Sequence, residues 1–274
     1  MSVLEFQAPE HGRTPVLVEV PHAGLNIPAA LRGEILATPE ALKRDADLHV
    51  NLLYQSVPEV GAGLLTALLS RYVVDLNRAP DDIDLESGQG ARVGQPRGVV
   101  WRVTTEGQPV LRKPLDVGGI QQRVDLYHAP YHARLRAELD AIKSRFGFAI
   151  LVAGHSMPSA VRRGAREVER RADVVPGSLS RTSADPRVID LVETVFRAAG
   201  LSVRHDEPYR GGFTTAHYGR PNEGIHAIQI EVNRALYMDE LTCEVKPGDF
   251  EKLQIILKDL VERLGQLDLG PGRS

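Results

Sequence analysis

Residues 149–156 read Ala149-Ile150-Leu151-Val152-Ala153-Gly154-His155-Ser156, an apolar run that ends in a histidine and a serine. Five consecutive apolar residues followed by a glycine are typical of a strand that is buried on both faces of a sheet. The same pattern occurs at Val16–Val20, which leads directly into Pro21 and His22. In open α/β sheets, ligands bind beyond the carboxyl ends of the strands. These two segments therefore predict an α/β fold with a polar site beyond its strand ends.

Other strand-like runs alternate with helical patterns along the chain. An Asp-Pro pair starts one helical pattern and a glycine ends it, while Pro130 predicts a kink or break in another. The alternation predicts a central, mixed and mainly parallel sheet flanked by helices. The strand patterns lie at 72–76, 201–203 and 225–232, and the helical patterns at 120–142, 185–200 and 250–264.

Two stretches lack a regular pattern. Residues 80–119 are rich in Asp, Gly and Pro, and irregular connections of this length are usually functional or disordered. The mixed charge run at 162–171 predicts a solvated short helix or loop. Because no linker divides the chain, we expect residues 1–264 to form a single catalytic domain and residues 265–274 a flexible tail.

Composition narrows the class of protein. The chain has 274 residues, with 33 basic and 36 acidic side chains and a formal net charge of −3, which argues against nucleic-acid binding. It contains no apolar run of about 20 residues, the length that a membrane span requires. A single cysteine, Cys243, excludes a disulfide framework and fits a reducing cytoplasm. We therefore expect a soluble cytoplasmic protein.

Polar residues follow four of the predicted strands. His22 and His155 each follow one, Asn77-Arg78 follows a third, and Glu231 lies near the end of a fourth. Two histidines and one carboxylate are a common zinc ligand set that leaves a position for water, whose pKa the ion lowers. A further carboxylate outside the ligand set would accept the proton of that water. An arginine beside these groups suits a substrate carboxylate, so the pattern predicts a metal-dependent hydrolase.

Each of these residues also has a structural interpretation. A histidine after a strand is often a turn residue, and Glu231 on its own is typical of an outward-facing strand carboxylate. Asp47, a further candidate carboxylate, lies between the first two strand patterns at the start of an apolar-periodic segment, where it would serve as a helix cap. Asn77-Arg78 would form a turn with a structural ion pair. The joint placement at strand ends is what favours the catalytic interpretation.

A second pair of histidines, His128 and His132, has a spacing that can bind a metal on a helix. However, Pro130 lies between them and disturbs the face that they would share, and no glutamate stands between them. We therefore do not place the metal there.

Several short segments occur together in an order that resembles the N-formylglutamate amidohydrolase family, which acts in histidine degradation. The resemblance extends from about residue 15 to about residue 240. The segments are Val20–Gly24, Asp47–His49 with Leu53-Tyr54, Ser70–Arg78, Pro130–His132, Gly154–Ser156, Arg210–Gly212, Thr215–Gly219, Gln229–Glu231 and Tyr237–Glu240.

This resemblance implies an architecture similar to that of zinc carboxypeptidases and aminoacylases, with one zinc ion per chain. It implies that Glu231 is the general base. For the third ligand it favours Asp47, with Asp45 and His49 as the alternatives. The implied metal ligands are His22, Asp47 and His155. The implied substrate-binding residues are Asn77, Arg78, Arg210 and His217.

The reaction implied by the resemblance removes an N-formyl or other N-acyl group from an acidic amino acid such as N-formyl-L-glutamate. The sequence departs from the family pattern at Ala153, where an aspartate is often found, at Leu48, where an aromatic residue is often found, and at 98–102. These departures leave two alternatives open. One is a related deacylase or peptidase that acts on another N-blocked amino acid, and the other is a catalytically silent protein that binds carboxylates.

Overall fold

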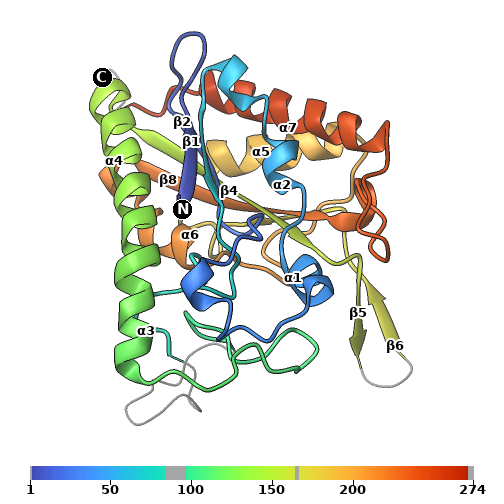
Figure 1. Ribbon diagram of the computed structural model, residues 1–274. Coiled ribbons are helices and arrows are strands. Elements are labelled where there is room, and N and C mark those ends of the chain that lie inside the picture. Colours follow the sequence, from blue (N-terminus) through green and yellow to red (C-terminus); the bar gives the residue numbers. More distant parts are fainter. Residues whose placement is uncertain (1, 84–96, 164–166, 271–274) are drawn as a thin grey trace. The chain divides into compact units, whose positions relative to one another are not determined.

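The computed structural model in Figure 1 describes residues 2–83, 97–163 and 167–270. Six of its strands form one sheet in the order β1-β3-β2-β4-β8-β7, and β5 pairs with β6 in a separate sheet of two strands. The strands are β1 (Leu4–Gln7), β2 (Val16–Val20), β3 (Gly63–Ala67), β4 (Ala149–Met157), β5 (Ala160–Arg163), β6 (Glu167–Arg170), β7 (Val174–Gly177) and β8 (Ile225–Asn233).

The centre of the large sheet is parallel. β4 pairs in parallel with β2 on one side and with β8 on the other, while β7 pairs with β8 in the antiparallel direction. Every residue of β2, β4 and β8 is buried, which explains the continuous apolar runs in the sequence. The predicted α/β class, with a mixed and mainly parallel sheet flanked by helices, is confirmed.

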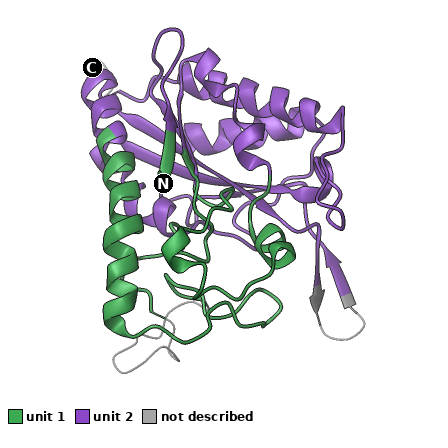
Figure 2. Cartoon of the chain, in the orientation of Figure 1, with its two compact units in different colours: residues 1–5, 21–48, 66–137 green, residues 6–20, 49–65, 138–274 purple. Residues whose placement is uncertain are grey.

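The chain forms two compact units, each assembled from segments that alternate along the sequence (Figure 2). The first unit comprises Met1–Glu5, Pro21–Leu48 and Thr66–Ala137. The second comprises Phe6–Val20, His49–Leu65 and Glu138–Ser274, and so includes β2, β4, β7 and β8. The single catalytic domain over residues 1–264 stays a prediction.

Helices cover the sheet strands of the second unit. α5 contacts β7 and α7, and α7 also contacts β2. Both helices follow the predicted patterns, and the Asp185 carboxylate caps α5 by accepting the N–H of Arg187. Among the described helices, none is long and apolar enough to cross a membrane. The α-helices are α1 (Pro39–Asp45), α2 (Val50–Leu53), α3 (Val117–Arg123), α4 (Ala129–Phe146), α5 (Pro186–Ala198), α6 (Phe213–Tyr218) and α7 (Asp249–Gly265).

The interruption expected at Pro130 takes the form of a π-helical turn. This turn, Val124–His128, joins α3 to α4, and within it the N–H of Ala129 bonds to the carbonyl of Val124, five residues back. Proline has no N–H to donate to the preceding turn, and a wider turn just before it accommodates that loss. The helix therefore changes its winding next to Pro130 and does not break.

The strand predicted at 72–76 is wrong, because these residues form turns and irregular structure, and the strand of this region is β3, a few residues earlier. The run is apolar because it is buried. The Arg123 guanidinium donates to the carbonyls of Tyr72 and Val73, at 3.3 and 3.1 Å. A side chain thus provides the hydrogen bonds that a neighbouring strand would otherwise supply.

Two further expectations need correction. The charge run at 162–171 contains part of the β5–β6 hairpin, not a helix or plain loop. Residues 201–203 contribute only a single bridge, from Val203 to Val174. The long connection at 80–119 is described only in part, because residues 84–96 lie outside the described ranges. The expected tail begins where α7 ends, at Gly265.

Candidate active site

The first predicted ligand, His22, follows β2 directly and is buried. Its Nε2 lies 2.7 Å from Oδ1 of Asp75, and its Nδ1 lies 3.5 Å from Oδ2 of Asp47. The N–H of Asp47 also donates to the His22 carbonyl. A neutral imidazole that donates from Nε2 to a carboxylate presents the lone pair of Nδ1 as its ligand atom. The contact with Asp75 therefore directs Nδ1 of His22 toward Asp47.

Asp75 is held as a carboxylate by several donors. It is fully buried, and its Oδ2 accepts from Nη2 of Arg71 at 2.6 Å and from Nε1 of Trp101 at 2.9 Å. Burial alone raises the pKa of Asp75, but Arg71, His22 and Arg78 together hold that pKa well below its usual range. Asp75 is not among the site residues predicted from the sequence. The signal was present, since one aspartate interrupts the otherwise apolar run from Tyr72 to Leu76.

If the group of His22, Asp47 and His155 holds a divalent metal ion, Asp75→Asn should weaken its binding about 10- to 100-fold, the usual cost of losing the carboxylate behind a metal-binding histidine. The amide carries no charge to hold the proton at Nε2 of His22. Competition with a coloured chelator measures the affinity. The matched control is Asp125→Asn, on an exposed aspartate of the same unit. If Asp75→Asn and the wild type bound the metal with equal affinity, Asp75 would have only a packing role.

The structure separates Asp47 from its two alternatives. Asp45, the last residue of α1, is buried and accepts the backbone N–H of Thr105 at 2.8 Å and the Thr105 hydroxyl. His49 places its Nε2 3.0 Å from the carbonyl of Cys243. Asp47 is the one of the three that groups with His22.

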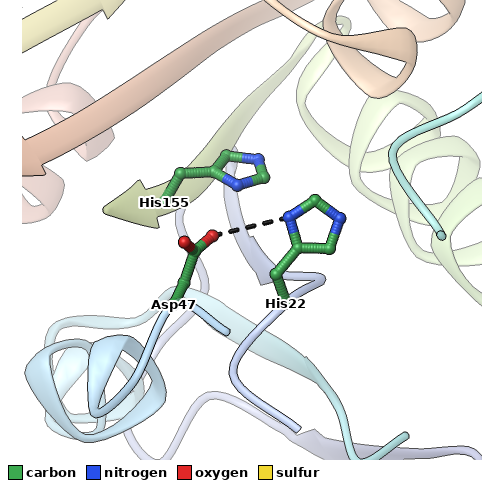
Figure 3. A group of neighbouring side chains, drawn as sticks. All are labelled: His22, Asp47 and His155. Carbon is green, nitrogen blue, oxygen red and sulfur yellow. Dashed lines mark ion pairs between the residues drawn. The ribbon is translucent and has the colours of Figure 1, made fainter. Parts of the chain in front are cut away.

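His155 completes the group of predicted ligands (Figure 3). One ligand atom from each of His22, Asp47 and His155 lies within 4.8 Å of the other two, and all three residues are buried. Figure 3 shows a ring nitrogen of each histidine turned toward the Asp47 carboxylate.

This donor set fits a divalent cation. Bonds of about 2.0–2.1 Å at the tetrahedral angle place two zinc ligands about 3.3 Å apart, and the His22–Asp47 pair lies at 3.5 Å. Two neutral imidazoles and one carboxylate are also ligands that zinc accepts. The three side chains can therefore hold a metal ion.

Local packing holds the end of β4 where His155 lies. The ring of Tyr54 packs on Gly154, and a Cβ added there would lie 2.5 Å from Cε2 of Tyr54. The hydroxyl of Ser156 accepts from Nε of Arg234 at 3.1 Å. The glycine before His155 and the serine after it are thus explained by packing and by an arginine contact.

The predicted general base lies one strand away from His155. Glu231 of β8 is the register partner of His155 in β4, so the two side chains lie on the same face of the sheet. Neighbouring strands are about 4.8 Å apart, and Glu231 is only 7% exposed. Its Oε1 accepts from Nε2 of Gln229 at 3.1 Å.

The segment of Arg210 reaches the same region through its backbone. The N–H of Gly212 donates to Oε1 of Gln229 at 2.9 Å. The segment also passes close over Gly177, the last residue of β7. A Cβ added to Gly177 would lie 2.7 Å from the backbone nitrogen of Gly211. The Arg210 side chain is exposed and donates to the Ser180 hydroxyl.

His217, also predicted to bind substrate, lies on α6, which contacts β8 and β4. Its ring stacks on Phe213, with the ring centroids 4.9 Å apart, and meets Tyr218 edge-on at 4.8 Å. These contacts fix the ring orientation at one side of the strands that carry Glu231 and His155.

Asn77 and Arg78 belong to the segment that holds His22. The N–H of Asn77 donates to Oδ1 of Asp75 at 3.0 Å, and Nη1 of Arg78 lies 3.5 Å from Oδ2 of Asp82. Their binding of a substrate carboxylate stays a prediction.

The second pair of histidines supports the same segment. Nε2 of His128 lies 2.9 Å from the Arg78 carbonyl, and Nε2 of His132 lies 2.9 Å from the Leu76 carbonyl. Within the part of the chain that the structure describes, only the group of His22, Asp47 and His155 has the arrangement of a metal site.

Comparison with known proteins identifies the family. A sequence model of the N-formylglutamate amidohydrolases matches residues 14–238. The chain belongs to the N-formylglutamate amidohydrolase family. An N-formylglutamate deformylase of Pseudomonas putida is 32% identical over 266 residues, which cover 96% of this chain and 95% of the relative. That of Pseudomonas aeruginosa is 33% identical over 266 residues, which cover 96% of each chain. The family resemblance seen in the sequence is confirmed.

A solved structure agrees with this membership of the N-formylglutamate amidohydrolase family. The crystal structure of an N-formylglutamate amidohydrolase from Ralstonia eutropha JMP134 has a TM-score of 0.87 and 32% identity, and the match covers 97% of this chain and 98% of that one. A protein from Agrobacterium tumefaciens shares the fold, with a TM-score of 0.70 at 19% identity over 96% of this chain and 95% of that one.

Proposed function

We propose that this protein is a metal-dependent hydrolase that removes the formyl group from N-formyl-L-glutamate. The observation that carries the proposal is the buried group of His22, Asp47 and His155, with Glu231 beside His155 on the neighbouring strand. The relatives named N-formylglutamate deformylase support the substrate. Zinc is the proposed ion, because two imidazoles and one carboxylate with an open position are a frequent catalytic zinc set.

The proposed reaction is the hydrolysis of a linear amide. A divalent cation, when bound, supplies a Lewis acid and makes water a nucleophile near neutral pH. Glu231 takes a proton from the attacking water and delivers it to the amine nitrogen as the C–N bond breaks. The products are formate and glutamate. Asp75 contributes by holding His22 in the tautomer whose Nδ1 lone pair would bind the ion.

Substrate recognition is proposed for polar residues outside the group of metal ligands. N-formylglutamate carries two carboxylates, and guanidinium groups bind carboxylates through two parallel hydrogen bonds. Arg78 and Arg210 are the arginines proposed for this role. The residues proposed to bind substrate are Asn77, Arg78, Arg210 and His217.

A substrate panel with controlled zinc content tests the proposal. The purified protein is analysed for metal and assayed on N-formyl-, N-acetyl- and N-succinyl-glutamate, with and without a chelator. We expect the formyl substrate to be hydrolysed fastest, the chelator to abolish the reaction, and added zinc to restore it. Preference for another acyl group would indicate a related deacylase. Carboxylate binding without hydrolysis after zinc loading would indicate a silent homologue.

A further inference from the structure

We infer that Gln229 is a positioning residue that orients the Glu231 carboxylate for proton transfer, an inference that rests on the proposed function. Gln229 lies in the interior of β8, two residues before Glu231 and on the same face of the sheet. It touches Glu231 directly, through the 3.1 Å bond from its Nε2 to Oε1.

The neighbours of Gln229 leave room for its side chain. Its register partner in β4 is Ala153, and its register partner in β7 is Gly177. These are two of the smallest residues, so on both sides of Gln229 the sheet face offers space instead of a packed side chain. The Gln229 side chain nevertheless remains buried, with 4% of its surface exposed. A buried amide needs hydrogen-bond partners on both of its ends, and Gln229 finds them along this face.

The backbone of the Arg210 segment determines which way the amide faces. The N–H of Gly212 is a donor that cannot change its role, and it lies 2.9 Å from Oε1 of Gln229. A flipped amide would turn a second donor toward that N–H. The oxygen of Gln229 therefore faces Gly212, and its NH₂ group faces Glu231. Gly177 makes this possible, because a Cβ there would collide with the passing segment.

The consequence concerns the position of the base. A general base must lie within about 2.6–3.2 Å of the group whose proton it takes, and a displacement of about 1 Å can cost about 100-fold in rate. The bond from Gln229 holds Oε1 of Glu231 in place and thereby restricts how the carboxylate can turn. Gln229 thus acts on the reaction through Glu231 and not through the metal ligands.

Two substitutions at Gln229 distinguish its contact with Glu231 from its contact with the Arg210 segment. Gln229→Ala removes both hydrogen bonds. Gln229→Glu keeps an acceptor for the Gly212 N–H but sets a carboxylate against that of Glu231. We expect kcat to fall about 100-fold in both variants, with KM changed far less and with zinc affinity and melting temperature close to wild type in Gln229→Glu. The matched control is Gln121→Glu, which alters an exposed glutamine that also donates to a carboxylate, Asp125, at 2.8 Å.

A double-mutant cycle tests whether Gln229 acts through Glu231. In a Glu231→Gln background, adding Gln229→Ala should cause no further loss of residual activity. The inference would be overturned by an unchanged kcat in Gln229→Glu, or by a double variant in which the two losses of activity multiply in full. The proposed function would still stand in that case, provided that the wild-type protein hydrolyses N-formylglutamate. A wild-type protein that hydrolyses none of the N-acyl substrates would overturn both.

Discussion

Replacing Glu231 by glutamine should abolish hydrolysis of N-formylglutamate and leave the metal in place. General bases typically contribute about 100- to 10,000-fold to a rate, and an amide cannot accept the proton of the attacking water. Glu231 lies outside the group of His22, Asp47 and His155, so zinc content should remain at the wild-type level. Steady-state kinetics and metal analysis of the same preparation measure both quantities.

The interpretation of Glu231→Gln depends on a control of equal chemistry. Glu223→Gln changes an exposed glutamate whose contact is an ion pair with Arg220 at 3.6 Å, and it should retain wild-type kinetics. If Glu231→Gln retained the wild-type rate, its role as general base would be wrong. Loss of zinc in Glu231→Gln would instead make Glu231 a ligand.

Removing a predicted metal ligand should differ from Glu231→Gln, because both the bound zinc and the activity should be lost. We expect His155→Ala and His22→Ala each to weaken zinc binding by more than the roughly 100-fold upper cost of losing an orienting partner such as Asp75. The reason is that a coordination bond is lost outright. Chelator competition and activity after zinc addition measure this effect.

Two control variants make the result specific. His11→Ala removes an exposed histidine and should bind zinc like wild type. His132→Ala removes a ring that lies 2.9 Å from the Leu76 carbonyl and should keep the bound metal. Normal zinc affinity in either His22→Ala or His155→Ala would remove that residue from the ligand set.

The buried centre of the sheet could be predicted from the sequence because burial on both faces leaves continuous apolar runs. Val16–Val20 and Ala149–Ala153 are such runs, and both form strands as predicted. The same reasoning fails at Tyr72–Leu76, where an apolar run reports burial but not the source of its hydrogen bonds. Those carbonyls are satisfied by Arg123, about 50 positions away in the chain.

The order of the residues shows which chemical groups follow the strands, since imidazole and carboxylate residues at strand ends are visible without any structure. How those groups are paired becomes visible only in the folded chain. The residue pattern alone does not separate Asp45 from Asp47, and only the family resemblance favours Asp47. In the structure Asp45 accepts from Thr105, whereas Asp47 groups with His22. Likewise, the bond from His22 to Asp75 joins residues 53 positions apart. Contacts between distant segments leave no periodic pattern in the chain, so they exist only once the fold has brought the segments together.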